Sequence, residues 1–338
     1  MKIPGYSIEL EKAVRKINSE EYKRVILQIP EGFKLHVLDF IDYFKKNTSA
    51  DIIISGDPCY GACDIGLLEY KDLGADFIIQ IGHVPIPSIK DYHIPMMFIN
   101  AKAEMSVKKV IEKAIPSIDV KQIGLVTTAQ HGDFLKEAKK ILESNGFDVS
   151  IGYGFSRVNF EGQVLGCNFS AATSIKDDVD AFLFIGSGDF HPLGLMLSTD
   201  RPVISCDPYT NKVRYKELDD LKDIVLRQRY GAITRSKDAK SFGILIGTKK
   251  GQQRMDLALK IKEQLEKKGK KSYFIALNHF IPSNIETFRK IDCFVSVACP
   301  RIAIDDYMQY KTPIITPVEL EILLGLKDWK EYKFDEIS

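Results

Sequence analysis

Asp180-Ala-Phe-Leu-Phe-Ile-Gly186 is an apolar run that opens on an acid and closes on a glycine. A strand buried on both faces of a sheet loses polar alternation, so this run predicts an inner strand of a parallel sheet. Asp76–Gly82 and Asp292–Ala298 share its layout, with an Asp, a large apolar residue two positions later and a small residue six positions later. The three Asp residues are 104 and 112 residues apart, about one domain's length each time. The three runs therefore indicate a repeated unit.

Predicted strands and helices alternate on both sides of these runs. This alternation is typical of parallel βαβ units, in which a helix connects one strand to the next. Amphipathic helices are predicted at Phe33–Phe44, Phe134–Ser144 and Gln253–Lys267. The expected strands are Arg24–Ile29, Ala50–Ser55, Asp76–Ile81, Pro95–Ile99, Gln122–Thr128, Asp148–Tyr153, Asp180–Ile185, Pro202–Cys206, Phe242–Gly247, Lys271–Ala276, Cys293–Val297 and Pro313–Thr316.

The repeated layout also predicts the domain organisation. We expect an α/β fold of three similar βαβ domains with parallel sheets, related by internal triplication and covering residues 1–105, 106–215 and 216–338. Residues 216–240 are charged and are predicted to form a helix that joins the second unit to the third. One large doubly wound sheet is the alternative, because the elements of such a sheet also resemble one another.

Composition and charge exclude several classes of protein. The 338 residues are 45% hydrophobic and 28% charged, which is typical of a soluble globular protein with a core. The net charge of +1 argues against direct nucleic-acid binding, which needs a basic excess. No apolar run approaches the roughly 20 residues that cross a bilayer, and Met1–Leu10 lacks the apolar stretch of a signal peptide. We therefore expect no membrane partner and a cytoplasmic location.

Three of the six cysteines follow predicted strands, one in each unit. They are Cys63, Cys167 and Cys299, and each comes after a small residue. Parallel sheets bind ligands at the carboxyl ends of their strands, so these loops are expected to meet. Three thiolates at the centre of three domains suit an iron–sulfur cluster that keeps one iron open for a substrate. Three unrelated buried thiols are the alternative, since free cysteine is among the most buried residue types.

The other three cysteines have weaker claims to a ligand role. Six cysteines in a chain of this length are too few for a disulfide scaffold. Cys206 and Cys293 fall at the end of one predicted strand and inside another, so they are expected in the core. Cys59 lies four residues before Cys63 and could act as a ligand. A compact CxxxCxxC cluster motif would need a third cysteine at position 66, where the chain has Gly66.

Two polar segments are candidates for ligand binding. Residues Thr248–Gln252 follow a strand and precede a helix, and their two lysines predict an anion site there. Gln252 adds both a donor and an acceptor. Arg301 could hold a carboxylate through two parallel hydrogen bonds, and an ion pair with Asp305 or Asp306 is the alternative. An ordinary solvated loop is the alternative for the lysine segment.

Histidines that follow strands are candidate catalytic residues. His83 and His191 are the two candidates, since a histidine's pKa lies near neutrality and either could serve as an acid or a base. His131 is a third histidine in such a position. A structural histidine that is hydrogen-bonded in a loop is the alternative for each. Gly186-Ser-Gly188 is too short for a dinucleotide-binding fingerprint, which needs a further glycine and an acid downstream.

The cysteine segments are similar to those of a known family. Tyr60–Asp64, Gly162–Asn168 and Val297–Arg301 resemble the three cysteine motifs of the archaeal diphthamide-biosynthesis enzymes, the 2-(3-amino-3-carboxypropyl)histidine synthase family. The resemblance spans essentially the whole chain. It continues in Thr127–His131, Gly186–Leu195 and Thr316–Leu326. Cys59 is extra to the motif, so the resemblance does not support a ligand role for it.

The resemblance implies an atypical radical enzyme that works as a homodimer. Each subunit is expected to bind a [4Fe–4S] cluster on Cys63, Cys167 and Cys299, with the three domains in a pseudo-threefold arrangement around it. S-adenosylmethionine is expected at the open iron, with Arg301 on its carboxylate and Gln252 on another polar edge. An electron donor reduces the cluster, and the sulfonium's bond to the methionine Cγ breaks. The 3-amino-3-carboxypropyl group then adds to C2 of a histidine in translation elongation factor 2, and methylthioadenosine leaves.

Two alternatives remain open on the sequence. The first is an iron–sulfur enzyme similar to quinolinate synthase, a family that also looks like a triplicated α/β protein with a three-cysteine cluster. Its substrates are small acids. The second is a non-catalytic partner subunit that transfers electrons, because the eukaryotic pathway uses two related chains. Conversion of S-adenosylmethionine to methylthioadenosine by this chain alone would exclude the second alternative.

Overall fold

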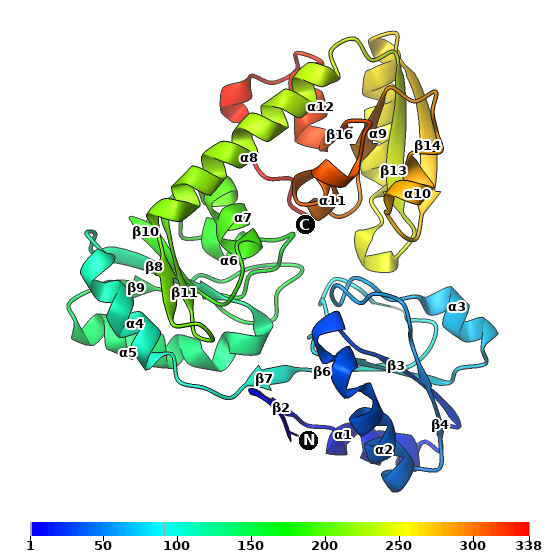
Figure 1. The fold of residues 1–338 in the computed structure, drawn as a ribbon, viewed down its shortest axis with the longest axis vertical. Coiled ribbons are helices and arrows are strands. Elements are labelled where there is room, and N and C mark those ends of the chain that lie inside the picture. Colours follow the sequence, from blue (N-terminus) through cyan, green and yellow to red (C-terminus); the bar gives the residue numbers. More distant parts are fainter. Residues whose placement is uncertain (1, 91, 338) are drawn as a thin grey trace.

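Three parallel sheets with the same strand order form the framework of the molecule. The structure is a computed structural model, and it describes residues 2–90 and 92–337. In each sheet the second strand of the unit lies at one edge, followed by the first, third and fourth: β4-β3-β5-β6, β9-β8-β10-β11 and β14-β13-β15-β16. All of these pairings are parallel. The predicted fold class of similar α/β units is therefore confirmed, and Figure 1 shows the units as three lobes around a common centre.

The first lobe contains a parallel sheet and a small antiparallel one. The strands of the parallel sheet, with the helices that precede and connect them, are α1 (Glu11–Ser19), β3 (Arg24–Gln28), η1 (Glu31–His36), α2 (Val37–Asn47), β4 (Asp51–Ile54), α3 (Leu67–Asp72), β5 (Phe77–Ile81) and β6 (Met96–Ile99). The small sheet, in the order β1-β2-β7, comprises β1 (Lys2–Ile3), β2 (Tyr6–Ile8) and β7 (Ala101–Ala103). This sheet was not predicted, because strands of two or three residues are too short to show periodicity.

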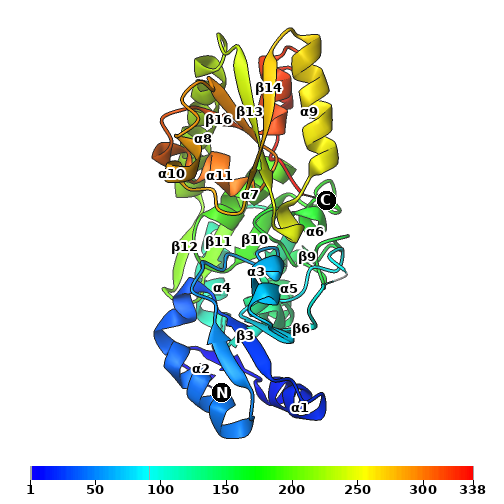
Figure 2. The same cartoon turned by 90° about the vertical axis from the view of Figure 1, so that its right-hand side faces the viewer.

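The second lobe extends its parallel sheet by one antiparallel strand, β12, which pairs with β11. Its elements are α4 (Lys108–Ala114), η2 (Ile115–Ser117), β8 (Gln122–Thr127), η3 (Ala129–Phe134), α5 (Leu135–Ser144), β9 (Asp148–Ser150), α6 (Ser170–Thr173), β10 (Ala181–Ile185), α7 (Phe190–Thr199), β11 (Val203–Asp207) and β12 (Lys212–Arg214). In Figure 2, which views the molecule from the side of the first and third lobes, this green lobe lies behind them.

The third lobe begins with the longest helix that the structure describes. Its elements are α8 (Lys216–Arg235), β13 (Ser241–Gly247), η4 (Lys250–Gln252), α9 (Met255–Lys267), β14 (Lys271–Leu277), α10 (Pro282–Ile285), β15 (Cys293–Ser296), α11 (Arg301–Ile304), η5 (Tyr307–Gln309), β16 (Ile314–Ile315), α12 (Pro317–Leu323) and η6 (Trp329–Glu331). None of the helices among residues 2–90 and 92–337 combines the length and the apolar character that crossing a membrane requires.

The Asp that opens each repeated run has the same structural role in all three lobes. The carboxylate of Asp76 accepts hydrogen bonds from the backbone N–H groups of Lys23 and Arg24, at 2.7 and 2.9 Å. Asp180 accepts one from Gln122 at 3.0 Å, and Asp292 accepts two from the backbone before and at the start of β13. Each acid thus ties the third strand of its unit to the beginning of the first. The repeat is a feature of the architecture rather than of the chemistry.

Several predicted elements differ from the structure at their ends. The predicted helix Phe33–Phe44 is a 3₁₀ turn, η1, followed by the α-helix α2. The predicted strand Asp148–Tyr153 ends at Ser150, because the chain then turns into the long loop that carries Cys167. The predicted domain boundaries near residues 105 and 215 stay predictions. They fall between β7 and α4 and between β12 and α8.

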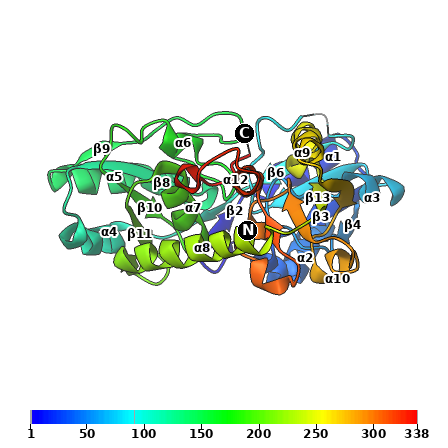
Figure 3. The ribbon, with the colours of Figure 1, turned by 90° about the horizontal axis from the view of Figure 1, so that it is seen from above.

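Helix α8 packs on two lobes at once. Leu218 and Val225, in its first part, belong to the apolar cluster around Phe182 and Phe184 of the second sheet. Ala232, near its end, belongs to the core of the third sheet. Figure 3 shows the helix running along one side of these two lobes. Shared burial of apolar side chains therefore holds the second and third lobes together.

Candidate functional site

A cavity of about 670 Å³ lies where the carboxyl-end loops of the three sheets meet. Its wall includes Cys63, Cys167 and Cys299, each of them partly exposed. Cys63 comes from the loop between β4 and α3, Cys167 from the loop between β9 and α6, and Cys299 from the loop between β15 and α11. The structure thus brings together the three cysteines that were predicted as ligands, from positions more than a hundred residues apart in sequence.

The three thiols are close enough to influence one another's ionisation. Burial, together with the smaller effect of a charge on Cys167, raises the pKa of the Cys63 thiol to about 11. Burial also raises the pKa values of Cys167 and Cys299, and for Cys299 both other thiols add to the effect. With only protein atoms around them, the three thiols are therefore protonated at neutral pH. A metal centre would replace these protons with its own positive charge.

The remaining cysteines lie outside the cavity wall. Cys59 is 3% exposed, and its Sγ lies 3.5 Å from Nε2 of Gln80 and 3.8 Å from Nδ1 of His83. Cys206 and Cys293 are fully buried in the cores of the second and third lobes, as predicted for them. Cys63 thus lines the cavity, whereas Cys59, four residues earlier in the sequence, is buried behind its wall.

Arg157 is a buried cation beside two of the three thiols. It is 4% exposed, and its charge lowers the pKa values of Cys63 and Cys167. One guanidinium nitrogen, Nη2, donates to the carbonyl of Gly251 at 3.0 Å, while the Nε–H has no partner within the part of the chain that the structure describes. A buried donor without a partner is costly, so this side chain fits a site completed by an anionic group.

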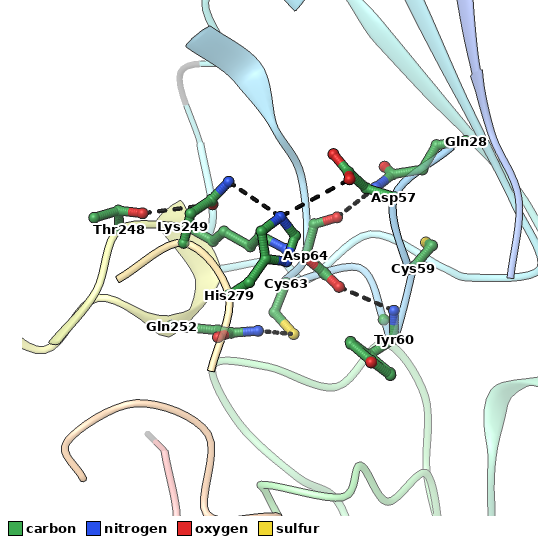
Figure 4. A network of polar contacts seen from close by, with 12 residues as sticks. Gln28, Asp57, Cys59, Tyr60, Cys63, Asp64, Thr248, Lys249, Gln252 and His279 are labelled. Atoms are coloured by element: carbon green, nitrogen blue, oxygen red, sulfur yellow. Dashed lines mark hydrogen bonds and ion pairs between the residues drawn. The ribbon is translucent and has the colours of Figure 1, made fainter. Parts of the chain in front are cut away.

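Asp64, next to Cys63, is fixed from three directions (Figure 4). Its carboxylate forms a buried ion pair with Lys249 and accepts a hydrogen bond from the backbone of Tyr60 at 3.0 Å. Its carbonyl accepts another from the side chain of Gln28 at 2.7 Å. Lys249 therefore binds an acid of the first lobe, and the predicted anion site in its loop loses one of its two lysines to this pair.

Gln252 and Arg301 both line the cavity. The Nε2 of Gln252 points to the Sγ of Cys63 at 3.7 Å, as Figure 4 shows. The guanidinium of Arg301 lies 4.3 Å from the centre of the Phe190 ring and pairs through Nε with Asp305 at 2.7 Å. The ion pair considered from the sequence is thus present, and it uses one edge of the guanidinium while the side chain still reaches the cavity.

The two candidate catalytic histidines also line the cavity. Burial lowers the pKa of His83 to about 4 and that of His191 to about 4, and Arg301 contributes to the second shift. His191 stacks on Phe184 with ring centres 5.7 Å apart. Both imidazoles are therefore neutral at pH 7, so neither can donate a proton as an imidazolium.

His131 belongs to a chain of polar groups between the first two lobes. Its Nδ1 lies 3.0 Å from the hydroxyl of Thr128, and its Nε2 lies 2.9 Å from the hydroxyl of Tyr209. That hydroxyl lies 2.7 Å from the hydroxyl of Tyr6, in the small sheet of the first lobe. This arrangement matches the structural alternative for His131, because both ring nitrogens have partners within the protein.

The burial of His131 predicts a loss of stability in acid. Burial lowers its pKa to about 4, whereas an unfolded histidine titrates near 6.5. Between these values the unfolded chain binds more protons, so stability falls as the pH drops through this window, by about 3 kcal/mol for this residue. We expect His131→Gln to flatten the pH dependence of the free energy of unfolding between pH 6.5 and 4, measured by urea titration. His93→Gln, at an exposed position, is the control, and equal slopes in wild type and His131→Gln would contradict the prediction.

The donor set fits a cluster better than a single ion. Among residues 2–90 and 92–337, no three His, Cys, Asp or Glu side chains lie close enough together to hold one metal ion. A four-iron cluster is larger, so its ligands stand further apart around a cavity. Three soft thiol donors suit iron–sulfur chemistry, and Arg157 with its unpartnered Nε suits the negative charge of such a group.

Sequence reasoning did not single out Arg157, and it gave Asp64 no role. Arg157 follows a bend in a loop that has no strand, helix or motif around it. Its function becomes visible only when the fold places it against Gly251 and Cys167. The need for glycine at position 251 also depends on a contact between lobes, because a Cβ there would lie 2.4 Å from the Cα of Cys63. Only a glycine lets this loop of the third lobe approach that cysteine.

Comparison with known proteins identifies relatives over nearly the full length. Residues 29–334 match the family model described as "Putative diphthamide synthesis protein". A 2-(3-amino-3-carboxypropyl)histidine synthase from Pyrococcus horikoshii is 39% identical over 335 residues, 97% of this chain and 92% of that protein. The synthase from Methanocaldococcus jannaschii is 32% identical, over 98% of this chain and 94% of the relative. Subunit 1 of the Caenorhabditis elegans synthase is 29% identical, over 95% and 80%.

A solved structure shares the fold. The crystal structure of Dph2 from Pyrococcus horikoshii with a 4Fe-4S cluster superposes with a TM-score of 0.89 at 38% sequence identity. The match covers 98% of this chain and 94% of that one. The three-lobed architecture is therefore common to the two proteins, including the region in which the carboxyl-end loops meet.

Proposed function

This chain belongs to the diphthamide synthesis protein family and is an enzyme of diphthamide biosynthesis, and on that premise we propose its reaction. It transfers the 3-amino-3-carboxypropyl group of S-adenosylmethionine to C2 of a histidine in translation elongation factor 2. The bond from sulfur to the methionine Cγ is replaced by a bond from Cγ to the imidazole carbon. The C2 proton is lost and methylthioadenosine leaves, so the overall reaction is neutral in electrons.

The convergence of three cysteines on one cavity carries this proposal. Cys63, Cys167 and Cys299 would hold a [4Fe–4S] cluster, a group that is present in the crystal structure of the Pyrococcus horikoshii relative. Bound there, the cluster would supply the single electron that breaks a carbon–sulfur bond of a sulfonium, and the radical adduct on the imidazole would give one electron back as it loses the C2 proton. Arg157 offsets the negative charge of the thiolates, and the Asp64–Lys249 pair fixes the loop of Cys63.

The other residues of the cavity wall bind and orient the cosubstrate. Arg301 presents its guanidinium to the methionine carboxylate, and the ring of Phe190 packs against one face of that guanidinium. Gln252, 8% exposed, holds a polar edge of the cosubstrate near Cys63. Which carbon–sulfur bond breaks depends on the orientation of each bond relative to the cluster. The contacts of Arg301 and Gln252 fix that orientation. His83 and His191 remain the candidates for accepting the proton, because a neutral imidazole offers a free nitrogen lone pair.

Activity of the purified chain tests the proposal. The protein is purified and reduced anaerobically, then incubated with S-adenosylmethionine and unmodified elongation factor 2. We expect methylthioadenosine, and a gain of one 3-amino-3-carboxypropyl group on a single histidine of the factor by mass spectrometry. A chain that carries iron and sulfide but forms neither product would contradict the proposal and favour the electron-transfer subunit. The family match over residues 29–334 favours this reaction over a quinolinate-synthase-like one.

Arg301→Ala tests the carboxylate contact. We expect the dissociation constant for S-adenosylmethionine to rise about tenfold, because a charge-assisted hydrogen bond to the carboxylate is lost while the rest of the cavity remains. Anaerobic equilibrium dialysis of the iron-loaded protein measures the change. Arg289→Ala, at an exposed position of the third lobe, is the matched control. An unchanged affinity in Arg301→Ala would remove the residue from the binding site.

The predicted assembly follows the same premise. A homodimer, an external electron donor and a cytoplasmic location remain predictions for this chain. Sedimentation of the purified protein tests the homodimer, because a dimer has twice the mass of the chain.

A further inference from the structure

The end of the chain runs between the second and third lobes and reaches two of the three cysteine loops. We call residues 334–337 the C-terminal strap. In Figures 1 and 3 the red C-terminal segment leaves α12 and passes into the centre of the molecule. Phe334, Asp335 and Ile337 are buried, although they follow the last regular element that the structure describes. The burial of a segment without regular secondary structure indicates that its side chains have specific partners in the fold.

The strap forms three hydrogen bonds with the loop of Cys167. The backbone N–H of Ile337 donates to the carbonyl of Cys167 at 2.7 Å. The side-chain amide of Asn168 donates to the carbonyl of Ile337 at 3.0 Å. The carboxylate of Glu336 accepts from the backbone N–H of Phe169 at 2.6 Å. The backbone on both sides of the thiol is therefore held by the strap.

The strap reaches the loop of Cys299 through Arg254. Asp335 pairs with both terminal nitrogens of this arginine, at 3.0 and 2.5 Å. The same guanidinium donates to the carbonyls of Val297 at 2.7 Å and Ala298 at 3.2 Å. These two carbonyls directly precede Cys299. A bidentate, largely buried ion pair fixes both direction and distance, so Asp335 orients the group that holds this loop.

Phe334 adds an apolar anchor near the proposed carboxylate site. Its ring packs edge-on against Phe169, with centres 5.5 Å apart, and against Phe190, with centres 6.4 Å apart. Phe190 is the ring over which Arg301 lies. Phe190 also contacts the backbone before Cys167, because a Cβ on Gly166 would lie 2.2 Å from its ring. Through Phe334, the strap thus packs against the aromatic ring that contacts Arg301.

The loop of Cys63 is held in a different way. Its ties are the Asp64–Lys249 pair and the close packing of Gly251 against Cys63. The strap therefore distinguishes the cysteines, since its contacts go to the loops of Cys167 and Cys299.

We propose that the C-terminal strap is a positioning element that sets the separation of Cys167 and Cys299 before the metal centre binds. The inference rests on the proposed function, in which these thiols share one cluster. Without the strap, part of the free energy of binding the metal centre would be used to order the loops of Cys167 and Cys299, which come from different lobes. A strap that holds both in advance removes that expense and makes assembly of the site faster and more complete.

Alkylation of the metal-free protein tests the strap independently of cluster chemistry. Two variants divide its contacts: Asp335→Asn weakens the tie to Arg254, and truncation after Asp335 removes Glu336 and Ile337. Each thiol's rate of modification by iodoacetamide is followed by peptide mass spectrometry at one pH. We expect about a tenfold increase at Cys299 in Asp335→Asn and at Cys167 in the truncated chain, because local opening becomes easier. Cys63 should change less than twofold.

The core cysteines and a second ion pair provide the controls. Cys206 and Cys293 report global unfolding, so their modification should stay slow. Glu321→Gln breaks the half-buried pair with Lys327, which lies in the same part of the chain but away from the cysteine loops, and should behave as wild type. Asp335→Glu keeps the charge and should restore most of the protection at Cys299. Equal acceleration at all five thiols, or none at Cys167 and Cys299, would overturn the inference.

Cluster content separates this inference from the proposed function. After anaerobic reconstitution, the wild type should hold four irons and four sulfides per chain, as the proposed [4Fe–4S] centre requires. The strap variants should fill more slowly and give an altered electron paramagnetic resonance signal when reduced. A wild type that binds no iron contradicts the proposed function. A filled wild type together with variants of identical filling rate and signal contradicts the strap alone.

Discussion

Replacement of Cys167 by alanine is expected to abolish the formation of methylthioadenosine, with a loss of about three orders of magnitude or more, because the cofactor carries the bond-breaking chemistry. Iron and acid-labile sulfide should fall with the activity. Cys63→Ala and Cys299→Ala should give the same result, since the three thiols line one cavity. The measurement is metal and sulfide analysis of anaerobically purified protein, together with quantification of methylthioadenosine.

Cys59→Ala and Cys206→Ala are the matched controls for this experiment. Both remove a buried thiol that lies away from the cavity wall. Their iron content should equal that of the wild type, and a modest loss of stability is the only effect expected of the core substitution. If all three of the other variants kept their cluster, the ligand assignment would be wrong. If Cys59→Ala alone lost its cluster, the extra cysteine would be the ligand in place of Cys63.

Arg229→Met is expected to lower the free energy of unfolding by about 3–5 kcal/mol, because it leaves the carboxylate of Glu319 buried without its partner. Both side chains of this pair are fully buried, with Nη2 and Oε2 2.6 Å apart. The guanidinium also donates to the carbonyls of Ala303 and Ile314. One arginine on α8 thus connects three segments of the third lobe. Urea unfolding, followed by circular dichroism, measures the loss.

A second substitution measures how much of the lost stability comes from the unpaired, buried carboxylate of Glu319. The double variant Arg229→Met with Glu319→Leu should recover part of the stability, since a buried ion pair can be replaced by apolar side chains at small cost. Recovery should be incomplete, because Glu319 also caps helix α12 through the backbone N–H of Thr316. A loss below 1 kcal/mol in Arg229→Met would contradict the prediction. The exposed pair Lys262–Glu266 offers a comparison, with an expected effect of a few tenths of a kcal/mol.

The repeated strands were predictable because their signal is local. Each inner strand is apolar on both faces, and the structure buries every residue of β5, β10 and β15. The cysteine loops were predictable as well, since parallel strands direct their carboxyl ends to one side of a sheet. The ends of α2 and β9 were less predictable, because caps and loop entry depend on contacts made later in the chain.

The parts of the site that sequence reasoning missed depend on contacts across the lobes. Arg157 and Arg254 are charged residues in loops, which usually face solvent, and Lys249 was predicted to bind an anionic ligand rather than Asp64. Their roles come from partners 81 to 185 residues away in the sequence: Gly251 for Arg157, Asp64 for Lys249 and Asp335 for Arg254. No local pattern marks such a pairing. The strap at the chain end was missed for the same reason.

The three acids that open the repeated runs give the three lobes a common framework. In each lobe the same carboxylate ties the third strand to the beginning of the first. The thiols do not obey that symmetry, since Cys63 and Cys167 follow the second strand of their units whereas Cys299 follows the third. The candidate site therefore breaks the threefold regularity of the sheets, and a search restricted to positions that recur in all three lobes would find the framework and overlook the cysteines.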